Sequence, residues 1–358
     1  MRAIIHRANI HYDGLTGCIL FFVAAVCILG CSSATSEGAI NGLKISSSVI
    51  IPSLFPFTVC TVFFQKSGGL LWLSNKLNKI TTLLFKLSGT EFSVILLSLL
   101  GGYPVGAKIA DELYVSGDIN KETAKKLLRY SVNPSPAFFI SVVGMNIFKN
   151  TLVGIILLIS NLIACFILNS IFISKKEPIN RARNFDNQGE NISDVFVKSV
   201  LAGAQITVNI CSFVVLFSSI AQILKMIPTK SNLHSFICPL LEISFGIKEI
   251  SQIGLPTPFY GFLLSFGGIS TICQIKQAAN NINPSFFYIL FHRLIHGTVT
   301  SIISLILFKL FPLDIEVFIG NSDIKLSEYP LFVPSIMLIV FSVLFLKFLA
   351  PERKTRAD

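Results

Sequence analysis

Long apolar runs without charged side chains recur along the chain and alternate with short polar segments. A helix that crosses the hydrocarbon core of a bilayer, roughly 30 Å thick, needs about 20 mostly apolar residues. Runs of about that length predict spanning helices over residues 15–36, 45–65, 151–173, 199–224, 253–275, 284–308 and 331–346. The run over 284–308 is interrupted by His292, Arg293 and His296.

Three apolar stretches are too short or too rich in Gly and Pro to be simple spans. They lie at 92–107, at 130–148 and around Glu242. Irregular backbone inside a membrane has to be shielded by protein, because lipid offers no hydrogen-bond partners. We therefore expect broken or re-entrant helices at these places.

The composition agrees with this pattern. Of 358 residues, 52% are hydrophobic and 13% are charged, and the mean hydropathy is +0.72. Soluble domains carry about 25% charged residues, so the fold class predicted is an all-α polytopic membrane protein in a lipid bilayer. The eight cysteines are scattered and form no C-x-x-C pair, so we predict no metal site, no disulfide framework and no cofactor.

The formal net charge is +10, and its distribution predicts orientation rather than nucleic-acid binding. Lys and Arg concentrate in cytoplasmic loops of membrane proteins. Arg2 and Arg7 precede the first span and four basic residues lie within 347–356, so both ends are expected in the cytoplasm. The acidic segment 312–330 suits the outer side, and the polar segment 174–198 suits a cytoplasmic linker. Charges of alternating sign over 111–129 predict a solvated surface helix.

The two halves of the chain resemble each other. The motif Phe-x-x-x-Leu-Leu-Ser at 92–98, with Gly101-Gly102 after it, matches 259–265 and Gly267-Gly268. The tripeptide Asn133-Pro134-Ser135 matches Asn283-Pro284-Ser285 in the same order. In many transporters such repeats are inverted and enclose a site near the bilayer midplane, built from Gly- or Pro-interrupted helices.

The predicted organisation follows from these patterns. We expect an N-terminal transmembrane helix (1–37), a first repeat (38–173), the cytoplasmic linker (174–198), a second repeat (199–310), an extracytoplasmic loop (311–330) and a C-terminal transmembrane helix with a basic tail (331–358). The first helix resembles a lipoprotein signal around Cys31, but we expect it to remain uncleaved.

The segment Gly101 to Lys108 predicts an anion site. It lacks the Gly-Lys-Ser/Thr ending of a P-loop, but its glycines free the backbone and Pro104 suits the first turn of a new helix. A helix N-terminus attracts anions, and Lys108 adds a positive charge. The alternative is a surface loop from which Lys108 reaches the membrane surface.

Ionisable residues inside apolar runs are costly and suggest function or a buried partner. Arg293 and Glu242 are such residues, and an ion pair between them is the structural alternative to a role in transport. Gln274 and Asn133 are candidate hydrogen-bonding ligands. No Ser-His-Asp, Cys-His or paired-carboxylate arrangement stands out, so an enzyme is not expected.

These motifs resemble one known group of proteins. The matches begin with Gly42-Leu43, Val49 and Pro52-Ser53-Leu54-Phe55-Pro56-Phe57, followed by Gly102-Tyr103-Pro104-Val105-Gly106-Ala107-Lys108. They continue with Asn133-Pro134, Leu241-Glu242-Ile243 with Gly246, Ser265-Phe266-Gly267-Gly268, Gln274, and Arg293 with His296-Gly297. Over residues 38–310 the chain thus resembles the YlbJ-type sporulation integral membrane proteins with nucleoside-recognition, or gate, domains. It departs from their pattern at Pro136 and in the long linker.

The resemblance implies a multi-pass protein of the inner membrane of an endospore-forming bacterium, or of its forespore membrane. It also implies a transporter of a small anionic metabolite, with export of dipicolinate, a planar dianion, as the first candidate. A transporter of nucleoside-like solutes or cations and a non-transporting sporulation scaffold are the alternatives, and a homo-oligomer is compatible with each.

The candidate site residues follow from both arguments. Lys108 and Arg293 would meet the substrate charge, Gln274 and Asn133 would orient the substrate, and Glu242 would be a counter-charge or coupling group together with His296. The remaining candidates for substrate binding are Gly102, Tyr103, Pro104, Gly106 and Ser265.

Overall fold

The computed structural model describes residues 2–85, 87–171, 191–227 and 233–313, and every regular element in these ranges is a helix. In chain order they are α1 (Arg2–Gly30), α2 (Ser32–Ile45), η1 (Ser46–Ile50), α3 (Ile51–Lys66), α4 (Gly69–Phe85), α5 (Gly89–Gly101), α6 (Tyr103–Val115), α7 (Lys121–Tyr130), η2 (Phe138–Ile147), α8 (Thr151–Ile171), α9 (Ile192–Lys225), α10 (Leu233–Leu241), α11 (Ile243–Ser251), α12 (Thr257–Phe266), α13 (Gly268–Ala278) and α14 (Phe286–Leu310). Here η marks a π-helix.

Five helical stretches among the described residues are long and apolar enough to cross a membrane. They are Ser32–Lys66, Thr151–Ile171, Ile192–Lys225, Thr257–Ala278 and Phe286–Leu310. This confirms the predicted all-helical membrane protein with several spans. The predicted span over 331–346, the basic tail, most of the loop 311–330 and most of the linker 174–198 lie outside the described residues.

The first two predicted spans have different boundaries in the structure. Helix α1 ends at Gly30, and α2, η1 and α3 then form one helical stretch from Ser32 to Lys66. The sequence suggested an interruption because Glu37 and Lys44 lie between the two apolar runs. Both side chains are exposed on the outer side of α2, where they do not disturb the helix.

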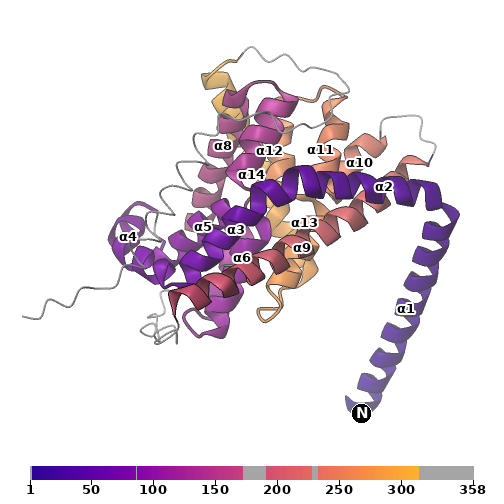
Figure 1. Cartoon of the computed structure of the whole chain (residues 1–358), viewed down its shortest axis with the longest axis horizontal. Helices are drawn as coiled ribbons and strands as arrows, with labels where there is room; N and C mark the ends of the chain where they lie inside the picture. The colour runs from indigo at the N-terminus through magenta and orange to yellow at the C-terminus, as the bar shows by residue number, and fades with distance from the viewer. Residues whose placement is uncertain (1, 86, 172–190, 228–232, 314–358) are drawn as a thin grey trace, which may run out of the picture.

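Helices α2 and α3 pack along the long helix α9, as Figure 1 shows. Close approach of α2 and α9 depends on Gly38 and Gly42. A Cβ at Gly38 would lie 2.5 Å from the Cα of Ser219, and one at Gly42 would lie 2.7 Å from the Cα of Val215. Small residues allow helix backbones in membranes to approach in this way.

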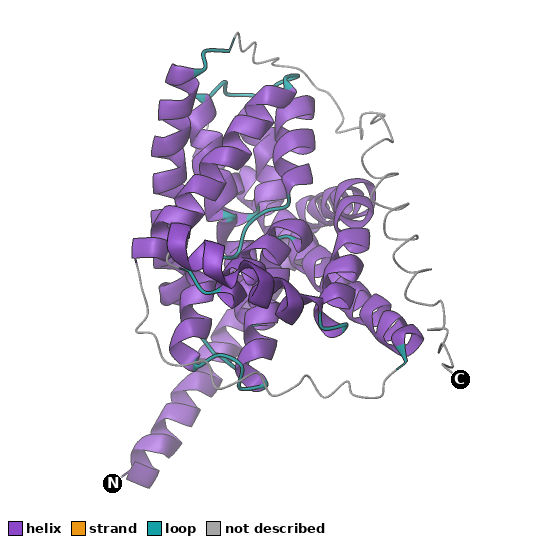
Figure 2. Cartoon of the chain, turned by 90° about the vertical axis from the view of Figure 1, so that its left-hand side faces the viewer, coloured by secondary structure: helices purple, strands orange, loops and turns teal. Residues whose placement is uncertain are grey.

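The interior consists of two main apolar clusters. One joins α6, α7, α13 and the start of α14, and the other joins η2, α8, α11 and α12. In Figures 1 and 2 helix α1 projects from the rest of the molecule.

The predicted surface helix over 111–129 is confirmed only in part: Lys121 and Glu122 at the start of α7 are exposed, but other charged residues of the segment are buried. The segment forms the end of α6 and all of α7, and Asp111 is 1% exposed while Lys126 is 4% exposed. Asp111 accepts hydrogen bonds from the backbone N–H groups of Asn281 and Ile282, and Lys126 donates to Glu91 at 2.7 Å. Asp111 and Lys126 thus both have partners that are distant in sequence. The alternation of charges along the chain cannot reveal such partners.

A candidate substrate site between broken helices

The first break separates α5 from α6 at Gly102. This residue has φ +81°, and its N–H bonds to the carbonyl of Ser98 at 2.8 Å. Such a positive φ favours glycine, because a Cβ strains the backbone there. Pro104 then lies in the first turn of α6, where its missing N–H costs no helical hydrogen bond. The helix therefore stops and restarts at this place, as the sequence predicted.

The second break separates α12 from α13 at Gly267 and Gly268, which have φ +82° and +84°. It is also the place that the internal sequence match predicts. A Cβ at Gly268 would lie 3.0 Å from the carbonyl oxygen of Leu241, the last residue of α10. The second break therefore touches the end of α10, where a third break begins.

The third break separates α10 from α11 at Glu242, whose backbone is extended. Its carboxylate accepts the N–H of Phe245 at 2.6 Å and so caps the N-terminus of α11. The residue is 2% exposed. A carboxylate at this position compensates the positive end of the helix dipole.

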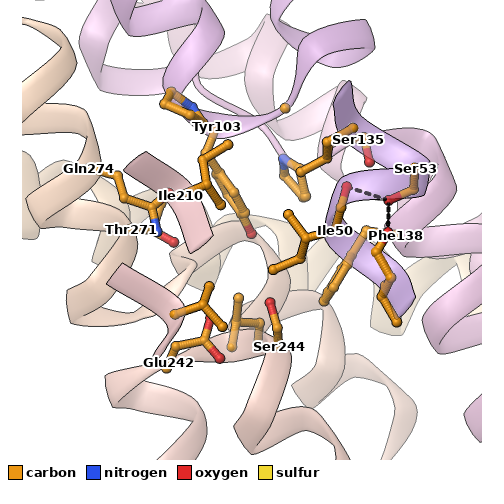
Figure 3. A pocket seen from close by; sticks show the side chains of 17 residues that line it. Ile50, Ser53, Tyr103, Ser135, Phe138, Ile210, Glu242, Ser244, Thr271 and Gln274 are labelled. Atoms are coloured by element: carbon orange, nitrogen blue, oxygen red, sulfur yellow. Dashed lines mark hydrogen bonds between the residues drawn. The ribbon is translucent and has the colours of Figure 1, made fainter. Parts of the chain in front are cut away.

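A small cavity lies between the breaks (Figure 3). Its volume is about 40 Å³, which suits one or two water molecules rather than a metabolite. Polar side chains on its wall are Ser53, Tyr103, Ser135, Glu242, Ser244, Thr271 and Gln274, and the other lining residues are Val49, Ile50, Leu54, Gly102, Pro104, Pro134, Phe138, Ile210, Val214 and Ile243.

Three helices begin at this wall, namely α6 at Tyr103, η2 at Phe138 and α11 at Ile243. The first N–H groups of a helix have no partner inside the helix, and the dipole adds positive potential there. Glu242 is the one charged residue among those that line the cavity. The cavity thus adjoins three helix ends, two of which already have partners: Glu242 accepts the N–H of Phe245 at the start of α11, and the carbonyl of Ser135 accepts the N–H of Phe138 at the start of η2.

Tyr103 connects the cavity to the second break. Its ring lines the cavity, and its hydroxyl donates to the carbonyl of Leu264 near the end of α12. The guanidinium carbon of Arg293 lies 5.6 Å from the centre of the same ring. Tyr103 therefore separates Arg293 from the cavity.

Arg293 is fully buried on α14 and bonds to backbone rather than to an acid. Its guanidinium donates to the carbonyls of Val132, Ser265 and Phe266, the last at 3.2 Å. The last two carbonyls belong to the end of α12, where the helix leaves them without partners. Among the described residues no ion pair joins Arg293 to Glu242. The ion pair that the sequence offered as the structural alternative is therefore absent from the described residues.

A chain of buried hydrogen bonds links the first break to the second. The hydroxyl of Ser98 accepts the backbone N–H of Asn133 at 3.3 Å. The amide of Asn161 on α8 donates to the Asn133 side-chain oxygen at 3.1 Å, and its own oxygen accepts the hydroxyl of Ser265 at 2.7 Å. Ser98 and Ser265 are the two serines that correspond in the internal sequence match.

The structure brings the candidate residues into two neighbouring groups. Gly102, Tyr103, Pro104, Glu242 and Gln274 line the cavity. Asn133, Ser265, Arg293 and His296 lie in the buried hydrogen-bond network, where the Nδ1 of His296 is 3.4 Å from Arg293.

Two further candidates lie outside both groups. A Cβ on Gly106 would lie 2.5 Å from the hydroxyl oxygen of Ser98, so this glycine serves close packing. Lys108 is half exposed and lies 3.6 Å from Glu112. That any of the candidate residues in either group, or these two, binds substrate stays a prediction.

Sequence reasoning missed Asn161 and several cavity hydroxyls. Asn161 is a fully buried amide in the middle of the apolar helix α8, and that isolation was the signal that could have identified it. Ser135 and Ser244 each follow a predicted helix break and line the cavity. No three His, Cys, Asp or Glu side chains of the described residues lie close enough to hold a metal ion.

Comparison with known proteins gives one informative similarity. No family model matches the chain, and no solved structure matches it. The chain is 21% identical over 332 residues to the sporulation integral membrane protein YlbJ of Bacillus subtilis (strain 168), and the similarity covers 81% of each chain. The resemblance predicted from the motifs is thereby confirmed, and this multi-pass membrane protein is a distant homologue of a sporulation integral membrane protein.

Proposed function

We propose that this protein transports a small anionic metabolite across a membrane during sporulation. The observation that carries the proposal is the cavity at which α6, η2 and α11 begin, enclosed between the helix breaks. Half-helix ends at the middle of a transporter are a recurrent way to bind a carboxylate, since their N–H groups and dipoles favour negative charge. Gln274 and Thr271 would add side-chain contacts to the bound anion.

The cavity is smaller than a metabolite, so binding requires the breaks to move apart. Glycines at each side supply the backbone freedom for such a movement. Glu242 serves as the coupling group, because its carboxylate repels an entering anion unless a proton or a cation accompanies that anion. Two repeats are part of this proposed architecture, because the matched sequences at 92–102 and 259–268 each contain the end of one helix directly before the next helix, α5 before α6 and α12 before α13.

Dipicolinate is the first substrate candidate, and the membrane around the developing spore is the proposed location. Both follow from the resemblance described above and from the sporulation homologue. A planar dianion with two carboxylates could engage two helix ends at once, whereas a nucleoside would leave those N–H groups without an anionic partner.

The test is uptake of labelled dipicolinate by liposomes that contain the purified full chain. We expect saturable uptake, and we expect Gln274→Ala to reduce it about tenfold, as the loss of one hydrogen bond to a charged group implies. Lys108→Gln tests the predicted charge contribution in the same assay. Lys121→Gln is the matched control, because Lys121 is an exposed residue of α7 and its loss should leave uptake unchanged.

Other outcomes would identify another function. A cation transporter is the second candidate, since Glu242 is the charged residue of the cavity wall, and it would move labelled sodium or protons without any anion. Uptake of uridine that dipicolinate does not inhibit would favour a nucleoside-like substrate. If the folded protein moves none of these solutes, the proposal fails and a scaffold function takes its place.

A further inference from the structure

Helix α4 has one face that is fixed firmly against the protein. The hydroxyls of Ser74 and Thr90 lie 2.8 Å apart, and the side-chain oxygen of Asn78 accepts the N–H of Gly89 at 2.9 Å. Leu70, in the first turn of α4, is fully buried. These contacts with α5 fix the rotation of α4 about its axis, so that its opposite face points outward.

The outward face combines large apolar side chains with two lysines. Trp72, Ile80 and Leu83 are 59%, 55% and 83% exposed, and Lys76 and Lys79 lie between them at helical spacing. The ammonium of Lys76 is 4.9 Å from the centre of the Trp72 ring. Helix α4 contains no acidic residue, and within the described ranges no acid forms an ion pair with either lysine.

The position of α4 in the chain places this face at a membrane surface. The spanning stretch Ser32–Lys66 ends just before α4, and a tight turn at Gly68, with φ +84°, connects the two. The start of α4 therefore lies at the level where a spanning helix leaves the bilayer. Tryptophan concentrates at that level, and lysine side chains extend from it toward the headgroups.

We propose that the outward face of α4, formed by Trp72, Lys76, Lys79, Ile80 and Leu83, binds anionic phospholipid headgroups. The three apolar side chains enter the edge of the hydrocarbon region, and the two ammonium groups meet the phosphates. A basic residue near an anionic membrane surface contributes about fivefold to affinity, so the two lysines select anionic over zwitterionic lipid. Contact with water alone would leave the exposed Trp72, Ile80 and Leu83 unexplained.

The chain offers a direct probe, because Trp72 is its single tryptophan. The full chain is reconstituted into phosphatidylcholine bilayers that contain a small, equal fraction of brominated phosphatidylglycerol or brominated phosphatidylcholine. Bromine quenches tryptophan at short range. We expect quenching by the anionic brominated lipid to exceed quenching by the zwitterionic one severalfold, and we expect aqueous acrylamide to quench weakly.

Charge variants separate headgroup binding from simple immersion in lipid. The double variant K76Q/K79Q should keep the emission maximum of the unmodified chain but lose the preference for the anionic lipid. The control K44Q/K121Q removes two other exposed lysines and should keep that preference. Equal quenching by the two brominated lipids in the unmodified chain would overturn the proposal. Strong acrylamide quenching without bromine quenching, or emission that depends on protein concentration, would overturn it as well, since the face would then meet water or a second copy.

Discussion

At the scale of single residues, Arg293 explains how a charge can be accommodated deep in the molecule. Its guanidinium bonds to the carbonyl of Val132 in the loop after α7 and to the carbonyls of Ser265 and Phe266, which the end of α12 leaves without helical partners. Arginine suits this position because its planar group presents several N–H donors in fixed directions. The cost of the buried charge is offset by backbone groups that would otherwise be unpaired.

We therefore predict that Arg293→Ala destabilises the protein in the absence of any substrate. The variant leaves three buried carbonyls without a donor, at a total cost of about 3 kcal/mol or more. In detergent its melting midpoint should fall by roughly 5 °C or more. Lys108→Gln, which alters a half-exposed side chain, should melt like the unmodified protein. An unchanged midpoint for Arg293→Ala would refute this stabilising role and leave the side chain free to bind substrate.

Several site residues were predictable because their chemistry is conspicuous in an apolar sequence. Glu242 and Gln274 are isolated polar groups near predicted breaks, and both line the cavity. Asp111 was misjudged because its partners, Asn281 and Ile282, lie far along the chain. The role of a charged residue depends on such distant contacts, and no local pattern encodes them.

At the scale of helices, the contact between α2 and α9 depends on glycine, which has no Cβ. The Cβ position of Gly38 is already occupied by backbone atoms of Ser218 and Ser219, at 2.6 and 2.5 Å. Backbone atoms cannot move aside as the end of a flexible side chain can. The two helices are therefore held at their present distance by glycine.

We predict that Gly38→Ala weakens this contact by about 1–3 kcal/mol, as overpacking in a well-packed interior does. Gly30→Ala is the matched control, because nothing lies within 4 Å of the Cβ position there. Thermal unfolding in detergent should show a lower midpoint for Gly38→Ala alone. Equal midpoints for the two variants would show that the helices separate easily.

The long apolar helices could be predicted from the length of apolar runs, whereas their ends could not. The breaks at Gly102 and Gly267 were predictable because glycine and proline interrupt an apolar pattern there. The joining of two predicted runs into Ser32–Lys66 was not, since a polar segment can continue a helix wherever one side of it is exposed. The amphipathic helix α4 carries too few apolar residues in succession to appear as a span.

At the scale of the whole molecule, the cavity of about 40 Å³ is too small for a metabolite. We predict that dipicolinate changes the structure around the breaks and leaves the surrounding spans unaltered. Hydrogen exchange of the protein in lipid nanodiscs, measured by mass spectrometry, should show slower exchange near Gly102, Gly267 and Glu242 when dipicolinate binds. Exchange within Thr151–Ile171 should stay the same.

Uridine is the control ligand for this measurement. It should leave exchange at all three breaks unchanged under the proposed anion specificity. Slower exchange spread evenly over the chain would instead indicate general stabilisation, and slower exchange with uridine alone would contradict an anionic substrate.

The hydrogen bonds from Ser98 through Asn133 and Asn161 to Ser265 have a mechanical consequence. They tie the first break to the second through one amide on α8, so neither can shift without straining or breaking bonds inside a medium that offers no replacement. Such a linkage favours concerted motion of the two breaks over independent motion of each. Asn161 therefore links the two breaks directly, although it is not among the residues that line the cavity.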